Sequence, residues 1–213
     1  MPHYYVEADG EVYLVQEDGE WRFPAHKESL PFPIEELYTL NVLGQEVCFC
    51  KPELGYHPHW CHKDELMGWE NVDPLVRQSV NLSLPRVVAE GIIVEDQSIL
   101  LVKPNRGFNK GQWTLPGGFV GYGEAPDVAV VREIQEEIGV TSKANQLLSL
   151  ESFIGQGSDI HWHMCFYDVT LLDREFNPAA DEIEEIDWFP IEKALTTIPF
   201  KNMQRVIKEQ YCS

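Results

Sequence analysis

Three glutamates lie within five residues of one another: Glu133, Glu136 and Glu137. On a helix, the spacing i, i+3, i+4 places their carboxylates on one side, where like charges repel and no lysine compensates them. One interpretation is a solvated acidic face, the ordinary reason for a run of acids. The other is a site for a hard divalent cation, because Mg²⁺ and Mn²⁺ prefer carboxylate and carbonyl oxygens. The spacing alone leaves both open.

These glutamates belong to a longer pattern that begins in a glycine-rich segment. Five residues separate Gly118 from Glu124, and seven more separate Glu124 from Arg132. Residues 132–140 then read Arg-Glu-Ile-Gln-Glu-Glu-Ile-Gly-Val. At every defined position this pattern resembles the box of the Nudix hydrolases. The resemblance covers residues 86–213 and does not obviously extend to residues 1–85.

The resemblance implies an activity and a cofactor. Nudix hydrolases cleave a pyrophosphate bond in a nucleoside diphosphate linked to another moiety, such as a nucleotide sugar, ADP-ribose or a dinucleotide, with Mg²⁺ or Mn²⁺. The metal ligands it implies are Gly118, through its carbonyl, Glu124, Glu133, Glu136 and Glu137. The catalytic residues it implies include Glu133, Glu137 and Arg132, whose guanidinium orients a catalytic glutamate.

The general base that takes the proton of the attacking water differs between members of that family. Glu133 is one candidate. The others lie in a later acidic stretch that contains Glu182, Glu184 and Glu185, and of these we expect Glu185. The alternative for this stretch is an acidic turn before an edge strand.

Cations and aromatic residues near the box are candidates for substrate contacts. Lys103, Arg106 and Lys110 reverse the local sign of charge, which favours phosphate binding, although a solvated loop explains them equally well. We expect substrate contacts from Arg106, Lys110 and Tyr122, and a place in the core for Trp113. Residues 150–158 lack the markers of the known substrate groups, so the substrate is predicted only as a class.

The elements that must position the box follow from the surrounding pattern. A helix is expected to begin at Pro126 and to end at the cap glycine Gly139. It should pack on a sheet through Val128, Val131, Ile134 and Ile138. Strands are expected at residues 87–94, 99–102, 146–153, 161–171 and 186–189, and a last helix at 202–211. We therefore predict an α/β fold, a Nudix-type α/β/α sandwich with a mixed sheet.

Residues 1–85 are predicted to form a small, mainly-β N-terminal domain with a linker helix, and residues 86–213 the Nudix domain. Two Asp-Gly pairs, at Asp9 and Asp18, predict hairpins. Asp73 and the proline after it should start the linker helix, and residues 34–40 are expected to form a short helix. Cysteines and histidines gather in this region: Cys48, Cys50, Cys61, His57, His59 and His62. They lack the paired knuckles of a zinc ribbon, which favours hairpin packing over structural zinc.

The composition limits the partners. The chain has 213 residues, with 16 Lys and Arg against 35 Asp and Glu, and a formal charge of −19 repels nucleic acid polymers and anionic membranes. The start of the chain does not resemble a signal peptide, and the apolar runs are strand-sized. We expect a cytoplasmic enzyme with a small nucleotide substrate, and a homodimer is an open alternative.

Two other functions are open alternatives. One is a Nudix module that binds a nucleotide or a partner without hydrolysis. The other is removal of a 5′ pyrophosphate from RNA, which the charge disfavours.

Overall fold

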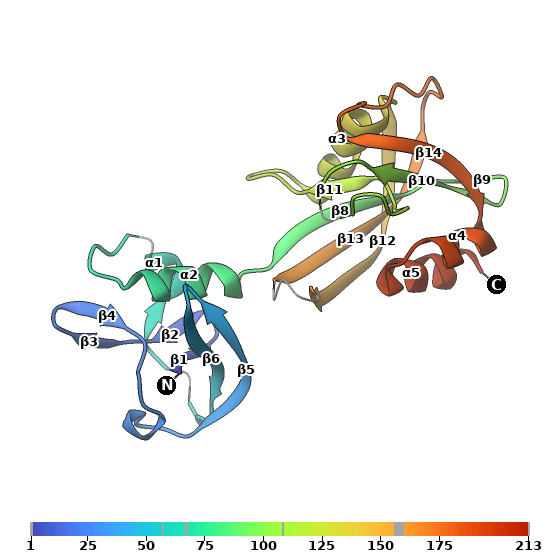
Figure 1. Ribbon diagram of the computed structural model, residues 1–213. Coiled ribbons are helices and arrows are strands. Elements are labelled where there is room, and N and C mark those ends of the chain that lie inside the picture. Colours follow the sequence, from blue (N-terminus) through green and yellow to red (C-terminus); the bar gives the residue numbers. More distant parts are fainter. Residues whose placement is uncertain (1, 57, 67, 108, 156–159, 213) are drawn as a thin grey trace. The chain divides into compact units, whose positions relative to one another are not determined.

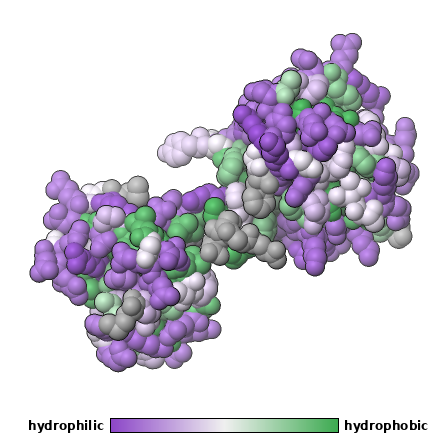
Figure 2. Space-filling view, in the orientation of Figure 1, coloured by the Kyte–Doolittle hydropathy of each residue, from purple (hydrophilic) through white to green (hydrophobic). Residues whose placement is uncertain are grey.

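The computed structural model describes residues 2–56, 58–66, 68–107, 109–155 and 160–212 (Figure 1). The chain divides into two compact units, which are residues 1–84 and residues 85–155 with 161–213. No helix among the described residues has the length and apolar character needed to span a membrane. The face of each unit seen in Figure 2 is mostly hydrophilic, as expected from a charge of −19.

The N-terminal unit is built on a five-stranded sheet in the order β5-β6-β1-β2-β7. Its strands are β1 (His3–Ala8), β2 (Glu11–Tyr13), β5 (Ile34–Val42), β6 (Gln45–Pro52) and β7 (Cys61–His62). A separate hairpin joins β3 (Val15–Glu17) to β4 (Glu20–Arg22), and the helical segments are η1 (Lys27–Ser29), α1 (Lys63–Leu66) and α2 (Pro74–Ser83). Both predicted Asp-Gly hairpins are confirmed, since Asp9 and Asp18 have φ values of 50° and 51° and each is followed by a glycine at 82°.

The linker helix α2 begins as predicted. The Asp73 side chain accepts a hydrogen bond from the backbone N–H of Leu75 at 2.8 Å, and Pro74 is the first helical residue. The helix buries Leu75 and Val76 in the same cluster as residues of the sheet.

The predicted helix over residues 34–40 is wrong, because this segment is strand β5. It pairs antiparallel with β6 along its whole length, and the hairpin is closed at Leu43 and Gly44, with φ values of 52° and 80°. Tyr38 of β5 also stacks on Phe49 of β6, with ring centroids 4.9 Å apart. Pairing and cross-strand contact therefore outweigh the local helix signal.

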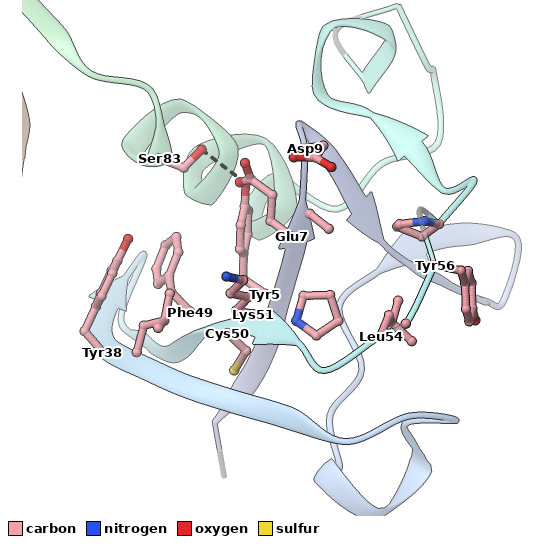
Figure 3. Close-up of a pocket in the computed structure, with 15 residues that line it drawn as sticks. Tyr5, Glu7, Asp9, Tyr38, Phe49, Cys50, Lys51, Leu54, Tyr56 and Ser83 are labelled. Carbon is pink, nitrogen blue, oxygen red and sulfur yellow. Dashed lines mark hydrogen bonds between the residues drawn. The ribbon is translucent and has the colours of Figure 1, made fainter.

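The N-terminal unit also carries an open pocket of about 780 Å³ beside β1, β5 and β6 (Figure 3). The Tyr5 hydroxyl lies at its wall, where it donates its proton to the Glu7 carboxylate and lies 3.1 Å from the Ser83 hydroxyl. Tyr38 and Phe49 form an aromatic wall.

The C-terminal unit has two sheets with helices on both sides. One sheet has the order β11-β8-β13-β12 and the other β14-β10-β9. The strands are β8 (Arg86–Ile92), β9 (Val94–Glu95), β10 (Ser98–Pro104), β11 (Gly117–Phe119), β12 (Ser142–Ile154), β13 (His161–Leu171) and β14 (Ile183–Pro190). Strand β8 runs parallel to β13 and antiparallel to β11, so its sheet is mixed.

Two hydrophobic cores show how the layers are arranged. Helix α3 (Pro126–Ile138) packs with Ala89, Leu100 and Val102 on one side of the strands. Helices α4 (Ile191–Thr197) and α5 (Lys201–Tyr211) pack with a second set of core residues on the other side. The strands are almost continuously apolar because both of their faces are covered, and the predicted α/β/α sandwich with a mixed sheet is confirmed.

The buried face of α3 differs in part from the prediction. Val128 is 56% exposed, and Ala129 and Val130 are buried in its place, together with the predicted Ile134 and Ile138. The helix is closely seated on the sheet at Gly91, where a Cβ atom would lie 2.9 Å from Ile134 Cδ1. This close approach determines which face of the helix is buried. Sequence periodicity predicts that face only to within about one residue.

Candidate active site

Two consecutive glycines bring the backbone of β11 against both the sheet and helix α3. A Cβ atom at Gly117 would lie 2.2 Å from the carbonyl oxygen of Ala89 on the paired strand β8. A Cβ atom at Gly118 would lie only 2.6 Å from the Glu133 carboxylate carbon. The absence of side chains at these positions therefore leaves room for the glutamates of α3 to reach the strand backbone.

Arg132 joins the acidic residues into one network. Its Nε and Nη2 donate to the two oxygens of Glu124 at 2.8 and 2.9 Å, a bidentate pair. Its Nη1 donates to Glu133 at 2.7 Å and to Glu136 at 2.8 Å, and Nη2 also donates to the Phe119 carbonyl at 2.9 Å. The hydrogen bonds from Arg132 and from the Gly121 N–H lower the pKa of Glu124 to about 2.

The three glutamates of α3 occupy different environments. Glu136 is the outermost, with a side chain 54% exposed, whereas the Glu133 side chain is only 16% exposed. Glu137 lies deeper, and its Oε2 accepts a hydrogen bond from the Gly117 N–H at 3.0 Å. Burial raises the pKa of Glu137 to about 8, and the charge of Glu133 adds to this effect. Burial also raises the pKa of Glu133.

A fourth carboxylate, that of Glu90, lies beside this group and is absent from the sequence prediction. Glu90 is on β8, directly opposite Gly117 of β11, and it is 5% exposed as a residue. Burial raises the pKa of Glu90 well above its usual value, and the charges of Glu137 and Glu133 raise it further. The sequence did contain a signal, because Glu90 is the one charged residue within residues 87–94.

Comparison with known proteins shows which protein family has this arrangement. A family model described as the NUDIX domain matches residues 85–210, more than half of the chain. The chain belongs to the Nudix hydrolase family.

Individual relatives agree with this assignment. The chain is 34% identical over 125 residues to the ADP-ribose pyrophosphatase of Methanocaldococcus jannaschii, covering 59% of this chain and 72% of the relative. It is 31% identical over 109 residues to the NAD-capped RNA hydrolase NudC of Pseudomonas aeruginosa, covering 51% of this chain and 37% of NudC. This chain therefore spans less than half the length of several relatives, NudC among them.

A solved structure gives the same result for the fold. The MutT Nudix hydrolase from Burkholderia pseudomallei is similar to this chain with a TM-score of 0.52 and 32% identity, covering 61% of this chain and 99% of that one. The predicted family and enzyme class, a Nudix pyrophosphohydrolase, are confirmed.

The late glutamates are not equivalent around the Nudix box. Glu185 lies in β14 opposite Lys103 of β10, and Lys103 Nζ is 2.7 Å from Glu185 Oε1. Glu182 precedes the strand, and its charge adds to the burial that raises the pKa of Glu133 and of Glu137. Both are ion-paired, Glu185 with Lys103 and Glu182 with Arg106, and the charge of Glu182 acts on the glutamates of the box.

The predicted substrate residues lie at the surface near the box. Arg106 forms an ion pair with Glu182, Lys110 is exposed, and Tyr122 is fully exposed. Trp113, expected in the core, is partly buried and packs edge-on against Phe189 at the margin of the core, with centroids 4.8 Å apart. Residues 156–158 of the predicted marker stretch lie outside the described residues.

The cysteines of the N-terminal unit lie in two clusters. Cys48 and Cys50 are buried together with their Sγ atoms 3.5 Å apart, whereas Cys61 packs with a different core. His57 lies outside the described residues. Within the described ranges, no three His, Cys, Asp or Glu side chains are already arranged as a metal site in either unit.

The residues of the Nudix box nevertheless suit a divalent cation by their chemistry. Their donors are carboxylate oxygens, the type that Mg²⁺ and Mn²⁺ prefer. Glu137 is buried beside other acids, and Oε2 of the buried Glu90 has no hydrogen-bond partner among the described residues. A cation bound here would compensate the negative charges of these glutamates. In the hydrogen bonds described above, Arg132 is the one positive group that does so.

Proposed function

We propose that this protein hydrolyses a pyrophosphate bond in a nucleoside diphosphate linked to another moiety, with Mg²⁺ or Mn²⁺ as cofactor. The observation that carries the proposal is the complete Nudix box, whose glutamates are brought by α3 against the glycines of β11. The relatives support the reaction class, while the cofactor rests on the chemistry of the donors.

In this proposal Glu133, Glu136, Glu137 and the Gly118 carbonyl hold the cation. When bound, the cation neutralises the diphosphate and lowers the pKa of a water molecule. Arg132 holds one oxygen of Glu133 and one of Glu136 in this structure, so the other oxygen of each carboxylate can take the cation. Glu124, which was expected among the ligands, has both oxygens held by Arg132 and braces the turn before α3.

The general base takes a proton from the water that attacks phosphorus. Glu133 is a candidate because its carboxylate is largely buried beside Gly118. We propose Glu182 as the second candidate in place of Glu185. Both are ion-paired, Glu182 with Arg106 and Glu185 with Lys103, but the charge of Glu182 acts on Glu133 and Glu137. Arg106, Lys110 and Tyr122 remain the proposed substrate contacts at the surface near the box.

The substrate class includes ADP-ribose, nucleotide sugars and dinucleotides. The archaeal relative named as an ADP-ribose pyrophosphatase makes ADP-ribose the first compound to test. The relative NudC acts, by its name, on NAD-capped RNA, but a charge of −19 opposes binding of a polymer of phosphates.

The test is a panel of these compounds with Mg²⁺ or Mn²⁺, read by the masses of the two products. We expect cleavage between the phosphates, and a loss of at least about 100-fold in the Glu136→Gln variant. The matched control is Glu209→Gln, an exposed position of α5. No product from any compound would reject the proposal. Nucleotide binding without turnover, measured by calorimetry over hours, would favour the alternative of a Nudix module that binds a nucleotide without hydrolysis.

The domain division is a proposal of its own. We propose that residues 1–85 and residues 86–213 are separate domains, with the first acting in dimerisation or in closing over the substrate. Light scattering of the full chain tests the homodimer. Limited proteolysis should cut first near residue 85 if the division is correct.

A further inference from the structure

The side chain of Glu90 is unusual for its place in the fold. It lies on the inner strand β8, between β11 and β13, where neighbouring positions are apolar core residues such as Val88 and Ile92. Its Oε2 is buried and has no hydrogen-bond partner among the described residues. Leaving a buried polar group unpaired destabilises the fold, and a charged group does so more strongly, so such a group calls for a partner.

The Glu90 carboxylate lies against Gly117, the residue that precedes the Nudix box. A Cβ atom at Gly117 would lie 3.0 Å from Glu90 Oε2 and 2.8 Å from Glu90 Cα. The N–H of the same glycine donates to Glu137 Oε2 at 3.0 Å. Glu90 from the sheet and Glu137 from α3 therefore flank one glycine, and the space left by its missing side chain receives the Glu90 carboxylate.

The charges around Glu90 narrow the choice of partner. The charges that act on it are those of Glu137 and Glu133, which have its own sign. Arg132 is bound to Glu124, Glu133 and Glu136, and no hydrogen bond joins it to Glu90 in the described part of the chain. A cation bound from solution would compensate these like charges and pair with the free oxygen, and buried carboxylate oxygens select a hard divalent one.

We propose that Glu90 is a ligand of the catalytic divalent cation, supplied by strand β8 from outside the Nudix box and acting together with Glu137. This inference rests on the proposed function for the existence of the cation. It assigns to strand β8 a part in metal binding beside the glutamates of α3 and the Gly118 carbonyl of β11, and it explains why an acid occupies a core position of β8.

The first experiment measures Mn²⁺ binding to the full chain without nucleotide, by the electron paramagnetic resonance signal of the free ion. We expect Glu90→Gln, which keeps the size of the side chain and removes its charge, to weaken Mn²⁺ binding by at least about tenfold. The matched control is Glu95→Gln, at a partly exposed glutamate that pairs with Arg174, and it should bind within about twofold of the wild type. Wild-type affinity in Glu90→Gln, or no Mn²⁺ binding to the wild type, would overturn the inference.

A second measurement covers the case in which Glu90→Gln does not fold, as judged by its thermal unfolding in EDTA. Crystals of the wild type grown with Mn²⁺ should show the anomalous peak of the ion about 2.1 Å from a Glu90 oxygen. A peak that touches only the glutamates of α3 would overturn the inference.

Activity on the compound panel, measured with the same samples, separates the two proposals. Weakened Mn²⁺ binding in Glu90→Gln without any cleavage by the wild type would reject the proposed function and leave Glu90 as a metal ligand. Cleavage by the wild type with unchanged Mn²⁺ binding in Glu90→Gln would support the proposed function and reject Glu90 as a metal ligand.

Discussion

The adjacent glycines Gly117 and Gly118 should respond to alanine in opposite ways. In Gly118→Ala the new methyl group would lie 2.6 Å from the Glu133 carboxylate carbon, so this carboxylate must retreat by about 0.8 Å to reach ordinary contact at 3.4 Å. The group that moves is the end of a flexible side chain, and Gly118 has no positive φ. Stability should fall by less than about 1 kcal/mol. A misplacement close to 1 Å at a catalytic group costs about 10- to 100-fold in kcat.

In Gly117→Ala the neighbour is backbone. The methyl group would lie 2.2 Å from the Ala89 carbonyl oxygen, and β8 must move by about 1.2 Å although it is paired on both sides. Overpacking of this kind costs about 2–4 kcal/mol, which corresponds to a fall in Tm of about 5–15 °C for a domain of this size.

Both variants are measured by thermal unfolding in EDTA and by kcat on the substrate found in the panel. Gly55→Ala is the matched control, because a Cβ atom there would have nothing within 4 Å. The reasoning is refuted if Gly118→Ala lowers Tm as much as Gly117→Ala does, or if Gly118→Ala keeps full activity.

Three further predictions follow from the hydrogen bonds. Asp73→Ala removes the cap of α2 and should lower the free energy of unfolding by about 1 kcal/mol in urea titrations. Arg132→Lys loses the bidentate pair with Glu124 and, because the site is partly exposed, should cost about 1–2 kcal/mol in the same assay. Hydrogen bonds from the hydroxyl and the N–H of Thr141 lower the pKa of Asp173 below its ordinary value of 3.8. This stabilisation is present above that pH and is lost as the pH falls, so acid should lower Tm less in Asp173→Asn than in the wild type.

Each of these has a comparison that would contradict it. Arg22→Lys alters an arginine whose pairing with Glu20 is at the surface, and it should change stability by less than about 0.5 kcal/mol. An equal loss in Arg22→Lys and Arg132→Lys would show that the network around Arg132 has no special value. An unchanged urea midpoint in Asp73→Ala, or equal acid sensitivity in Asp173→Asn and the wild type, would reject the other two.

Local signals in the sequence were enough to determine several elements. The helix that begins at Pro126 and ends at Gly139, with φ of 75° at the glycine, follows from capping chemistry that involves only neighbouring residues. The Asp-Gly hairpins and the cap at Asp73 are local in the same sense. The spacing from Gly118 to residue 140 identified the family, because a binding site held on one turn and one helix leaves its pattern in consecutive residues.

Other features were decided by contacts between distant parts of the chain. Residues 34–40 form a strand because β6 pairs with them, and that pairing outweighs a weak local preference. The face that α3 buries depends on its close approach at Gly91, which shifts burial from Val128 to Val130.

The candidate site shows the same division. The sequence determined its glutamates and their order along α3, because helical spacing alone puts them together. Only the tertiary structure brought Glu90 to them, across the pairing of β8 with β11, and brought the charge of Glu182 to act on Glu133 and Glu137. The physical reason is that the pKa of a carboxylate depends on its burial and on the charges near it, and these come from strands and loops far away in sequence.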